Sequence, residues 1–522
     1  TYTGAVTLAT GNDTTVILTS TGGTVSFGNL LDATTAGEQG LTVTGNASFG
    51  GLVGGTEALR ALSVSGTTAV NALAVTTSNV GGGTGNQTYT GIVTLGTANG
   101  TTVNLTATGG TVAFGNFLIA TTAGQQGLAV VGNASFANVV GGTALRSLSV
   151  SGTTAINTTG ITTSNAAGGT GNQVYTGAVT LLSDTTLTAT GGTVTFHGTV
   201  DDTGGDSNET LTIAGKAAFN NQVGSLLPLE ALSVSGTTSI GTTVIKTSNV
   251  DGGTGDQSYS GAVTLATGND TTVILTATGG TVSFANLLNA TAHGEQGLTV
   301  TGNASFGGLV GGTAALRALS VSGTTAINGL AITTSNVGGG TGNQTYTGAV
   351  TLGTANGTTV TLTATGGTVA FGNFLNGTTD GEQGLDVVGN ASFANQVGGT
   401  KLLRSLSVSG TTAINTTDIK TSEMAGGTGN QTYTGAVTLG ANTTLDSDNG
   451  NIWFKSTVNG AQTLTLDAGT GTVTMEGAVG SGPILTSLTV TAATTFVNGG
   501  VVTTTGNQTY NGNLTLGADT VA

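Results

Sequence analysis

Acidic side chains gather at one place in this sequence, and grouped carboxylates are what calcium binding and glycosidic chemistry require. The densest patch runs from Asp201 to Glu209 and includes Asp202 and Asp206. Two carboxyl groups held about 5 to 9.5 Å apart can cleave a glycosidic bond, and oxygen-rich turns can bind Ca²⁺. The residue order differs from that of an EF-hand loop and from that of Gly-rich calcium-binding nonapeptides. The preferred interpretation is a solvated turn, with a calcium site at Asp201, Asp202 and Asp206 as the alternative.

The remaining residue types that carry out catalysis are scarce. The sequence has two histidines, His197 and His293, and no cysteine. Without a partnered histidine, the many serine hydroxyls have no general base. The lack of cysteine excludes thiolate metal sites, cysteine nucleophiles and disulfides. We therefore expect no catalytic residue, no cofactor and no metal apart from the calcium alternative, and we predict that the protein is not an enzyme.

A few cationic and aromatic residues could contact a ligand. Arginine recurs in the phrase A-L-R-A-L-S-V-S-G or a close variant, at Arg60, Arg146, Arg317 and Arg404. A row of cations would suit an anionic polysaccharide or a neighbouring molecule, but a long side chain that covers apolar surface at a turn is the preferred interpretation. The single tryptophan, Trp453, stands where the first repeat has the outward residue Ser26, and it could mark a lateral contact or a carbohydrate platform.

The tyrosines reveal a long internal repeat that must position these residues. All seven lie in the phrase T-Y-T-G-A-V-T-L or a near variant, at Tyr2, Tyr89, Tyr175, Tyr259, Tyr346, Tyr433 and Tyr510. Their spacings are 87, 86, 84, 87, 87 and 77 residues, and a fixed long period indicates a stacked repeat protein. Residues 4–18 recur almost verbatim at 261–275, so three repeats have been duplicated as a block. We expect the tyrosines to pack at strand starts, with periodic sugar stacking as the alternative.

These spacings define six repeats and the start of a seventh. The repeats comprise residues 1–88, 89–174, 175–258, 259–345, 346–432, a divergent 433–509, and 510–522. Each holds short runs, such as Val6-Thr7-Leu8, in which apolar and hydroxyl residues alternate between Gly- and Asn-rich turns. Such alternation predicts half-buried strands, and no segment has helical periodicity.

The fold class follows from these strands. We predict an all-β protein, a right-handed parallel β-helix (β-solenoid) with about four coils of roughly 20 residues in each ~86-residue repeat. Glycine and asparagine between the runs would supply the tight turns at the corners. An array of antiparallel sandwiches would also have short strands and frequent turns, but the repeats here run into one another without linkers.

Composition limits the partners. The chain carries 24 acidic and 9 basic residues, for a net charge of −15, whereas nucleic-acid binding needs clustered Lys and Arg. No apolar run approaches the length of a transmembrane helix, so we expect no membrane insertion by this segment. Hydrophobic residues make up 37% of the chain, which indicates a packed core rather than a disordered tail.

Three phrases resemble the repeats of filamentous-haemagglutinin-like bacterial adhesins. They are G-N-Q-T-Y-T-G-I-V-T-L at Gly85–Leu95, L-S-V-S-G-T-T-A-I-N at Leu148–Asn157, and T-T-G-N-Q-T-Y-N-G at Thr504–Gly512. The similarity covers essentially the whole chain. It implies a surface or biofilm-matrix protein exported by two-partner secretion or as an autotransporter passenger, and hence an extracellular or outer-cell-surface location. We expect the sequence to be a segment of a longer protein.

The residues and the resemblance together predict a structural shaft of a large secreted bacterial adhesin or extracellular filament. Its expected partners are neighbouring copies, flanking repeats of the same chain and, as a further candidate, polysaccharide. A sheath or matrix subunit that stacks head to tail is the main alternative. A polysaccharide-active β-helix enzyme is less favoured. So is an ice-binding protein, because the T-x-T motif recurs irregularly.

Overall fold

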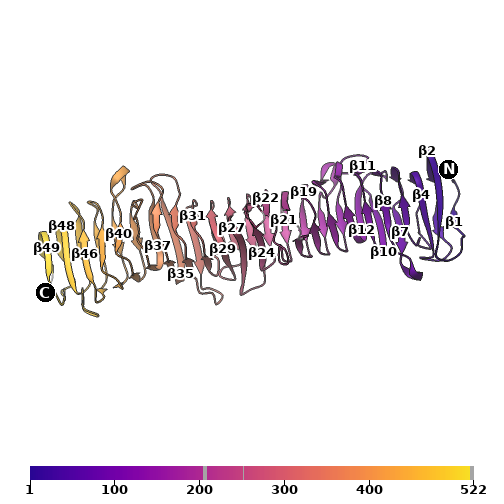
Figure 1. The fold of residues 1–522 in the computed structure, drawn as a ribbon. Coiled ribbons are helices and arrows are strands. Elements are labelled where there is room, and N and C mark those ends of the chain that lie inside the picture. Colours follow the sequence, from indigo (N-terminus) through magenta and orange to yellow (C-terminus); the bar gives the residue numbers. More distant parts are fainter. Residues whose placement is uncertain (204–208, 251, 518–522) are drawn as a thin grey trace. The chain divides into compact units, whose positions relative to one another are not determined.

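The computed structural model describes residues 1–203, 209–250 and 252–517, and it divides the chain into two compact units, Thr1–Gly261 and Ala262–Ala522 (Figure 1). Within the described residues, helical structure is limited to three-residue 3₁₀ turns, η1 (Val80–Gly82), η2 (Ala166–Gly168) and η3 (Met424–Gly426). None of these described helical segments has the length or apolar character needed to cross a membrane. Each unit is a parallel β-solenoid, which confirms the all-β, parallel β-helical prediction.

The strands of the first unit are short and regularly spaced. They are β1 (Val6–Leu8), β2 (Thr14–Phe27), β3 (Leu31–Ala33), β4 (Gln39–Phe49), β5 (Leu62–Val64), β6 (Thr68–Val70), β7 (Ala74–Ser78), β8 (Gln87–Tyr89), β9 (Val93–Leu95), β10 (Thr102–Phe114), β11 (Leu118–Ala120), β12 (Gly127–Phe136), β13 (Val140–Leu145), β14 (Leu148–Val150), β15 (Thr154–Ile156), β16 (Gly160–Ser164), β17 (Gln173–Tyr175), β18 (Val179–Leu181), β19 (Thr185–Phe196), β20 (Val200–Asp202), β21 (Thr210–Phe219), β22 (Ala231–Val234), β23 (Thr238–Ile240), β24 (Val244–Ser248) and β25 (Gln257–Tyr259).

The second unit repeats the same pattern. Its strands are β26 (Val263–Leu265), β27 (Thr271–Phe284), β28 (Leu288–Ala290), β29 (Gln296–Phe306), β30 (Leu319–Val321), β31 (Thr325–Ile327), β32 (Ala331–Ser335), β33 (Gln344–Tyr346), β34 (Val350–Leu352), β35 (Thr359–Phe371), β36 (Leu375–Gly377), β37 (Gly384–Phe393), β38 (Leu406–Val408), β39 (Thr412–Ile414), β40 (Asp418–Lys420), β41 (Gln431–Tyr433), β42 (Val437–Leu439), β43 (Thr443–Asp446), β44 (Ile452–Phe454), β45 (Val458–Asn459), β46 (Thr463–Asp467), β47 (Thr472–Met475), β48 (Ser487–Val497) and β49 (Gln508–Leu516).

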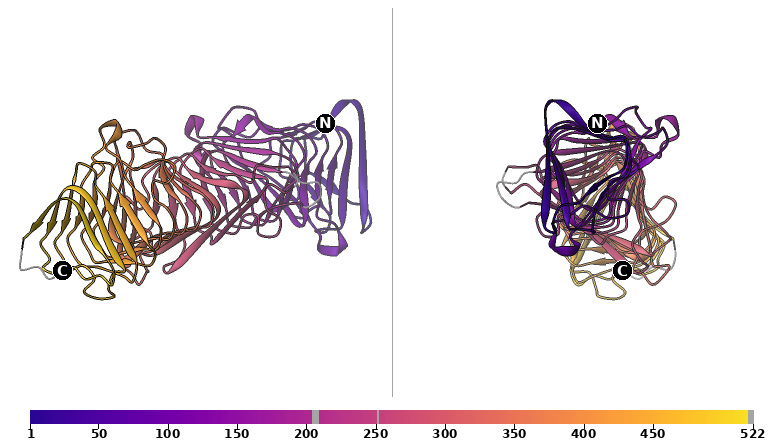
Figure 2. Two further views of the ribbon diagram at one scale, coloured as in Figure 1. Left: turned by 60° about the vertical axis from the view of Figure 1, so that its left-hand side comes forward. Right: turned by 90° about the vertical axis from the view of Figure 1, so that its right-hand side faces the viewer.

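Each strand pairs in parallel with the strands one turn before and one turn after it. For example, β5 pairs with β4 on one side and with β8 on the other. Leu62 and Val64 of β5 are 1% and 0% exposed, whereas Ser63 between them is only half-buried. Period-two alternation therefore places Val, Leu and aromatic residues inside the coil, and Thr, Ser and Ala outside. Figure 2 shows the strands of successive turns lying one behind another within each unit.

The strand register counts the turns of the first unit. One column of facing residues, the Tyr2 column, passes through Tyr2, Phe27, Phe49, Val70, Leu95, the β11 residues Ala120 and Leu118, Val140, Ile161, Leu187, Ile213, Val234 and Tyr259. With β11 counted once, these twelve positions are separated by eleven turns. The 257 residues from Tyr2 to Tyr259 thus give about 23 residues per turn, longer than the roughly 20 expected from the sequence.

This turn length gives a physical reason why the repeats recur in a block of three. Residues 2 to 259 hold three sequence repeats and eleven turns, so one repeat advances three and two-thirds turns. Each turn crosses three columns. Val43 belongs to the Tyr89 column, Phe49 to the Tyr2 column, and Val53 to the column that leads through Val75 and Val150 to Tyr175. Successive repeats therefore begin one column further round the coil. Three repeats are needed before a sequence position returns to the same column.

The aromatic stacks follow this displacement of successive repeats from one column to the next. The stacks of the first unit are Tyr2–Phe27–Phe49, Tyr89–Phe114–Phe136 and Tyr175–Phe196–Phe219, one in each column. Adjacent rings lie 5.3 to 5.7 Å apart between centroids and are nearly parallel. The length of a turn thus distributes the largest core side chains evenly over the three sides of the coil.

The phrase G-N-Q-T-Y builds a polar connection inside the coil. The Tyr89 hydroxyl donates to Oε1 of Gln87 at 3.0 Å, and Nε2 of Gln87 donates to the carbonyls of Val75 and Thr106 at 3.0 and 2.9 Å. Both side chains are fully buried. Because buried polar groups need partners, the glutamine and the tyrosine recur together. Burial also raises the pKa of the Tyr89 hydroxyl well above its ordinary value.

The second unit has its own continuous column. It passes through Val263, Leu288, Val310, Ile332, Leu362, Val387, Val408, Tyr433, Phe454, Met475, Val497 and Leu516. These twelve residues are again eleven turns, spread over 253 residues. The aromatic stack changes in the divergent sixth repeat, where Met475 follows Phe454 in the position that Phe136 takes after Phe114.

Candidate functional site

Two of the recurring arginines fasten turns together. Nη1 of Arg60 forms an ion pair with Asp13, and its Nη2 donates to the carbonyl of Gly82 at 3.3 Å. In the second unit, Arg317 forms the same pair with Asp270. Arg60 is half-buried, so its aliphatic part covers the corner. Its charged end joins the Asp13 loop, two turns earlier, to the Gly82 loop, one turn later. This geometry supports the interpretation of a turn-covering residue.

The other two arginines have a different environment. Gly100 and Gly357 occupy the loop positions of Asp13 and Asp270, and within the described residues Arg146 and Arg404 form no ion pair. Because one repeat advances three and two-thirds turns, Arg146 also lies one column away from Arg60 in the first unit. The same offset separates Arg404 from Arg317 in the second. Within either unit, the arginines therefore lie on different sides of the coil rather than in one row.

Replacing Arg60 with alanine should have a small effect on stability. An exposed or half-exposed ion pair contributes about 0–1 kcal/mol, so Arg60→Ala should lower the free energy of unfolding by no more than about 1 kcal/mol. Urea denaturation followed by far-UV circular dichroism measures this. Asp13→Asn should cost a similar amount, and the double variant should add little to either single change. A loss of several kcal/mol would show that Arg60 is a core element instead.

The acidic patch lies partly in strand β20. Asp201 and Asp202 are 7% and 4% exposed, whereas Asp206 lies outside the described residues. Oδ1 of Asp201 accepts the backbone N–H of Leu226 at 3.0 Å, which fixes the following loop. Asp202 points inward, at the place where the first repeat has the buried Ala33. The solvated-turn prediction is thus wrong for these two carboxylates, because β-strand pairing draws them into the wall of the coil.

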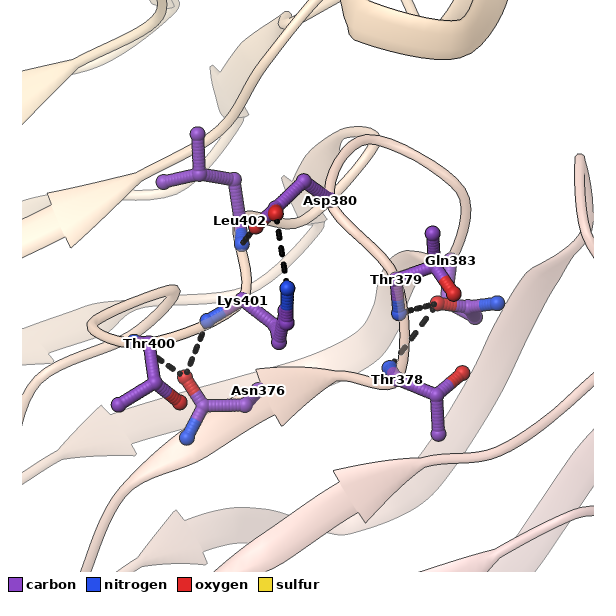
Figure 3. Close-up of polar contacts among 8 residues, drawn as sticks. All are labelled: Asn376, Thr378, Thr379, Asp380, Gln383, Thr400, Lys401 and Leu402. Carbon is purple, nitrogen blue, oxygen red and sulfur yellow. Dashed lines mark hydrogen bonds and ion pairs between the residues drawn. The ribbon is translucent and has the colours of Figure 1, made fainter.

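Figure 3 shows the equivalent loop of the fifth repeat, in which polar side chains fix the backbone. The Asn376 side-chain oxygen accepts the N–H groups of Thr400 and Lys401 at 3.1 and 3.4 Å. Oδ1 of Asp380 accepts the Leu402 N–H at 2.9 Å, and its Oδ2 accepts Nζ of Lys401 at 3.0 Å. The Leu402 N–H and then Lys401 lower the pKa of Asp380. These acidic and amide groups hold the loop in its conformation through hydrogen bonds.

Both histidines have comparable local roles. Nδ1 of His293, at the position of Asp380, accepts the backbone N–H of Ala315 at 3.2 Å. His197 lies 3.1 Å through its Nδ1 from the Asn220 amide. Among the residues that the structure describes, no group of three or more His, Asp or Glu side chains is arranged to hold a metal ion. The tyrosine alternative also fails, because Tyr89 and its counterparts Tyr175, Tyr259, Tyr346 and Tyr433 are fully buried and cannot stack on sugar.

Glu209 is the one carboxyl group in the described part of the patch with a strongly raised pKa. Burial raises the pKa of Glu209 to about 7, and the hydrogen bond and negative charge of Asp202 add to the shift, with Asp184 contributing. The first, second, fourth and fifth repeats have a buried glutamine here, such as Gln39. Two substitutions, to Glu209 and to Asp202, have therefore created an interacting acid pair in the third repeat.

This pair predicts a pH-dependent stability. Because the native pKa of Glu209 lies above the ordinary value of 4.5, the folded state binds the proton more tightly, and stability should fall as pH rises from about 4.5 to about 7. Glu209→Gln restores the common residue and should abolish this fall, so that its stability advantage grows over the same pH range. Urea unfolding at a series of pH values measures the difference.

A second variant tests the cause. Asp202→Ala restores the residue of the first repeat and removes the neighbouring charge, so the fall in stability should become smaller and shift to lower pH. If the stability difference between wild type and Glu209→Gln were the same from pH 4 to pH 8, the acid-pair explanation would be wrong.

Trp453 lies on the outside of the second unit. It is 37% exposed, and Nζ of Lys455 lies 4.0 Å from its ring centroid in a cation–π contact. The register places Trp453 beside Thr432 on one turn and Thr474 on the next. One turn further lies Phe496, an outward aromatic residue that the sequence analysis did not single out. Its signal was the phrase T-T-F-V, in which Phe496 stands where the phrase T-T-A-I of other repeats has alanine.

Comparison with known protein families, with characterised proteins and with solved structures gave no match to this chain. The structure brings together Asp202, Glu209 and Asp184, and separately Trp453, Thr474 and Phe496.

Proposed function

We propose that the chain is the structural shaft of a large, secreted bacterial adhesin or extracellular filament. The observation that supports this most is the uninterrupted stacking of eleven turns within each unit. In such a solenoid every turn is paired with its neighbours, and the eleven turns of one unit span about 50 Å at the usual strand spacing. Length and regularity, rather than a catalytic centre, are what this arrangement supplies.

The outer surface suits the same role. The outward row beside the Tyr89 column reads Thr88, Ala113, Ser135 and Ala155, which are small residues with little charge. Such rows can approach another molecule closely without burying many charges. We also propose a right-handed coil, because crossovers between parallel strands of one sheet are right-handed in nearly all proteins.

Immunogold labelling of the producing cells tests the shaft role. An antibody raised against this chain should label thin filaments on the outer surface or in the surrounding matrix. Label confined to the cell interior would overturn the proposal. Labelled structures that end freely agree with an adhesin shaft, whereas continuous sheets or polymers point to a matrix subunit that stacks head to tail.

Assays on the purified chain distinguish the remaining candidates. A shaft should release no reducing or unsaturated sugar ends from polyuronates and should leave ice-crystal shape unchanged. Sugar release that is lost in a Glu209→Gln variant would instead indicate an enzyme that uses the acid pair.

A further inference from the structure

The sixth repeat carries an outward row that differs from the rows of the other repeats. The row begins at Thr432, the last residue of the fifth repeat, and continues through Trp453, Thr474 and Phe496 of the sixth on the next three turns. At the place of Trp453, the second, third and fifth repeats have small residues, namely Ala113, Thr195 and Ala370. Two aromatic side chains thus replace small ones on one side of the second unit.

Phe496 faces outward through the ordinary alternation of β48. Thr495 and Val497 are the inward residues of this strand, each 2% exposed, and Phe496 lies between them on the outer face, half-buried. In the fifth repeat the corresponding residue is Ala413, which lies between the inward residues Thr412 and Ile414. The inward residues therefore keep their types, and a phenylalanine replaces a small outward residue.

The row has the spacing and the chemistry of a carbohydrate platform. Trp453 and Phe496 are two turns apart, which is about 9.5 Å at the usual spacing of strands and close to the length of a disaccharide repeat in an extended chain. Thr474 places a hydroxyl between the two rings. Aromatic faces with adjacent hydroxyls match the apolar faces and the hydroxyls of pyranose rings.

The border of the row is polar and electrically balanced. Lys455, Glu476 and Asn498 follow the strands on successive turns, since each donates its backbone N–H one turn back, to Tyr433, Phe454 and Met475 respectively. All three side chains are exposed. They provide a cation, an anion and an amide beside the aromatic row, so a neutral ligand with many hydroxyls fits better than a polyanion.

We propose that the row Thr432–Trp453–Thr474–Phe496 binds a neutral polysaccharide that lies along the stacking direction of the second unit. This goes beyond the shaft role, because it assigns a ligand class to one side of one repeat. It is also independent of that role, since binding is measured on the purified chain whatever its place in the cell.

The single tryptophan makes the test direct. Trp453 is the chain's one tryptophan, so its fluorescence reports only from this row. Titration with cellohexaose, chitohexaose and xylohexaose should shift the emission to shorter wavelength with at least one of them and should reduce quenching by acrylamide. Phe496→Ser keeps the inward residues of β48 and should weaken that binding by about tenfold. Far-UV circular dichroism of the variant checks that the coil is intact.

Phe374→Ser is the control, because Phe374 is an exposed phenylalanine of the second unit, at 41%, that lies outside the row. It should leave the affinity unchanged. The proposal is overturned if none of the three oligosaccharides changes the emission, or if Phe374→Ser weakens binding as much as Phe496→Ser does. An emission shift that depends on protein concentration alone would also overturn it, because the row would then be a contact between copies of the chain.

Discussion

Truncation of Phe114 to alanine should destabilise the first unit by about 3–5 kcal/mol, the usual cost of removing a buried aromatic side chain. Phe114 is 1% exposed and lies between Tyr89 and Phe136, with ring centroids 5.6 and 5.5 Å away. The cavity cannot be filled from the sides, because the strands on both neighbouring turns are held in register. Urea denaturation gives the loss in the free energy of unfolding.

The position of the loss is as informative as its size. Turns of a solenoid contact mainly their neighbours, so the backbone amides of β8, β10 and β12 should lose hydrogen-exchange protection first. Ala113→Ser changes the adjacent outward residue and should alter stability by less than about 0.5 kcal/mol. Phe196→Ala, at the equivalent place in the next column, should behave as Phe114→Ala does. A loss below 1 kcal/mol for both phenylalanines would contradict the stacked core.

The fold class could be predicted from two signals in the sequence. Local alternation in runs such as Val6-Thr7-Leu8 shows which residues face inward, and the 257-residue spacing of Tyr2 and Tyr259 shows that a block of three repeats recurs. The length of a turn was harder to predict. Long strands such as β2 bend at glycine within a turn, and loop residues add to the turn without a clear periodic signal.

The candidate sites were predictable only where one substitution breaks a pattern. Trp453 was found because alternation places it outward, and the structure agrees. Phe496 was missed because only the pairing of β48 with β47 places it in one outward row with Trp453. The ion pair of Arg60 with Asp13 joins residues 47 positions apart, and the burial of Asp202 depends on its pairing with Leu181 of the preceding turn. The ion pair and the burial of Asp202 both depend on contacts between turns, which cannot be read from a short stretch of sequence.

The corners of the coil should tolerate a methyl group at one glycine and reject it at another. Gly177 stacks directly on Gly152, and a Cβ on Gly177 would come within 2.3 Å of the Gly152 carbonyl oxygen. Because that oxygen belongs to the backbone, the corner must shift to make room. Gly177→Ala should therefore lower the free energy of unfolding by about 2–4 kcal/mol, at the upper end of overpacking costs.

Gly160 provides the same substitution without the clash. A Cβ there has its nearest neighbour at 3.7 Å, and the equivalent residues Ala74 and Ala331 already carry one. Gly160→Ala should raise stability by about 0.4–1 kcal/mol, because alanine restricts the unfolded chain more than glycine does. If the corner glycines are required for close stacking, thermal and urea unfolding should show a loss of stability for Gly177→Ala and a gain for Gly160→Ala. Equal effects would mean that glycine is frequent here for reasons other than the approach of one turn to the next.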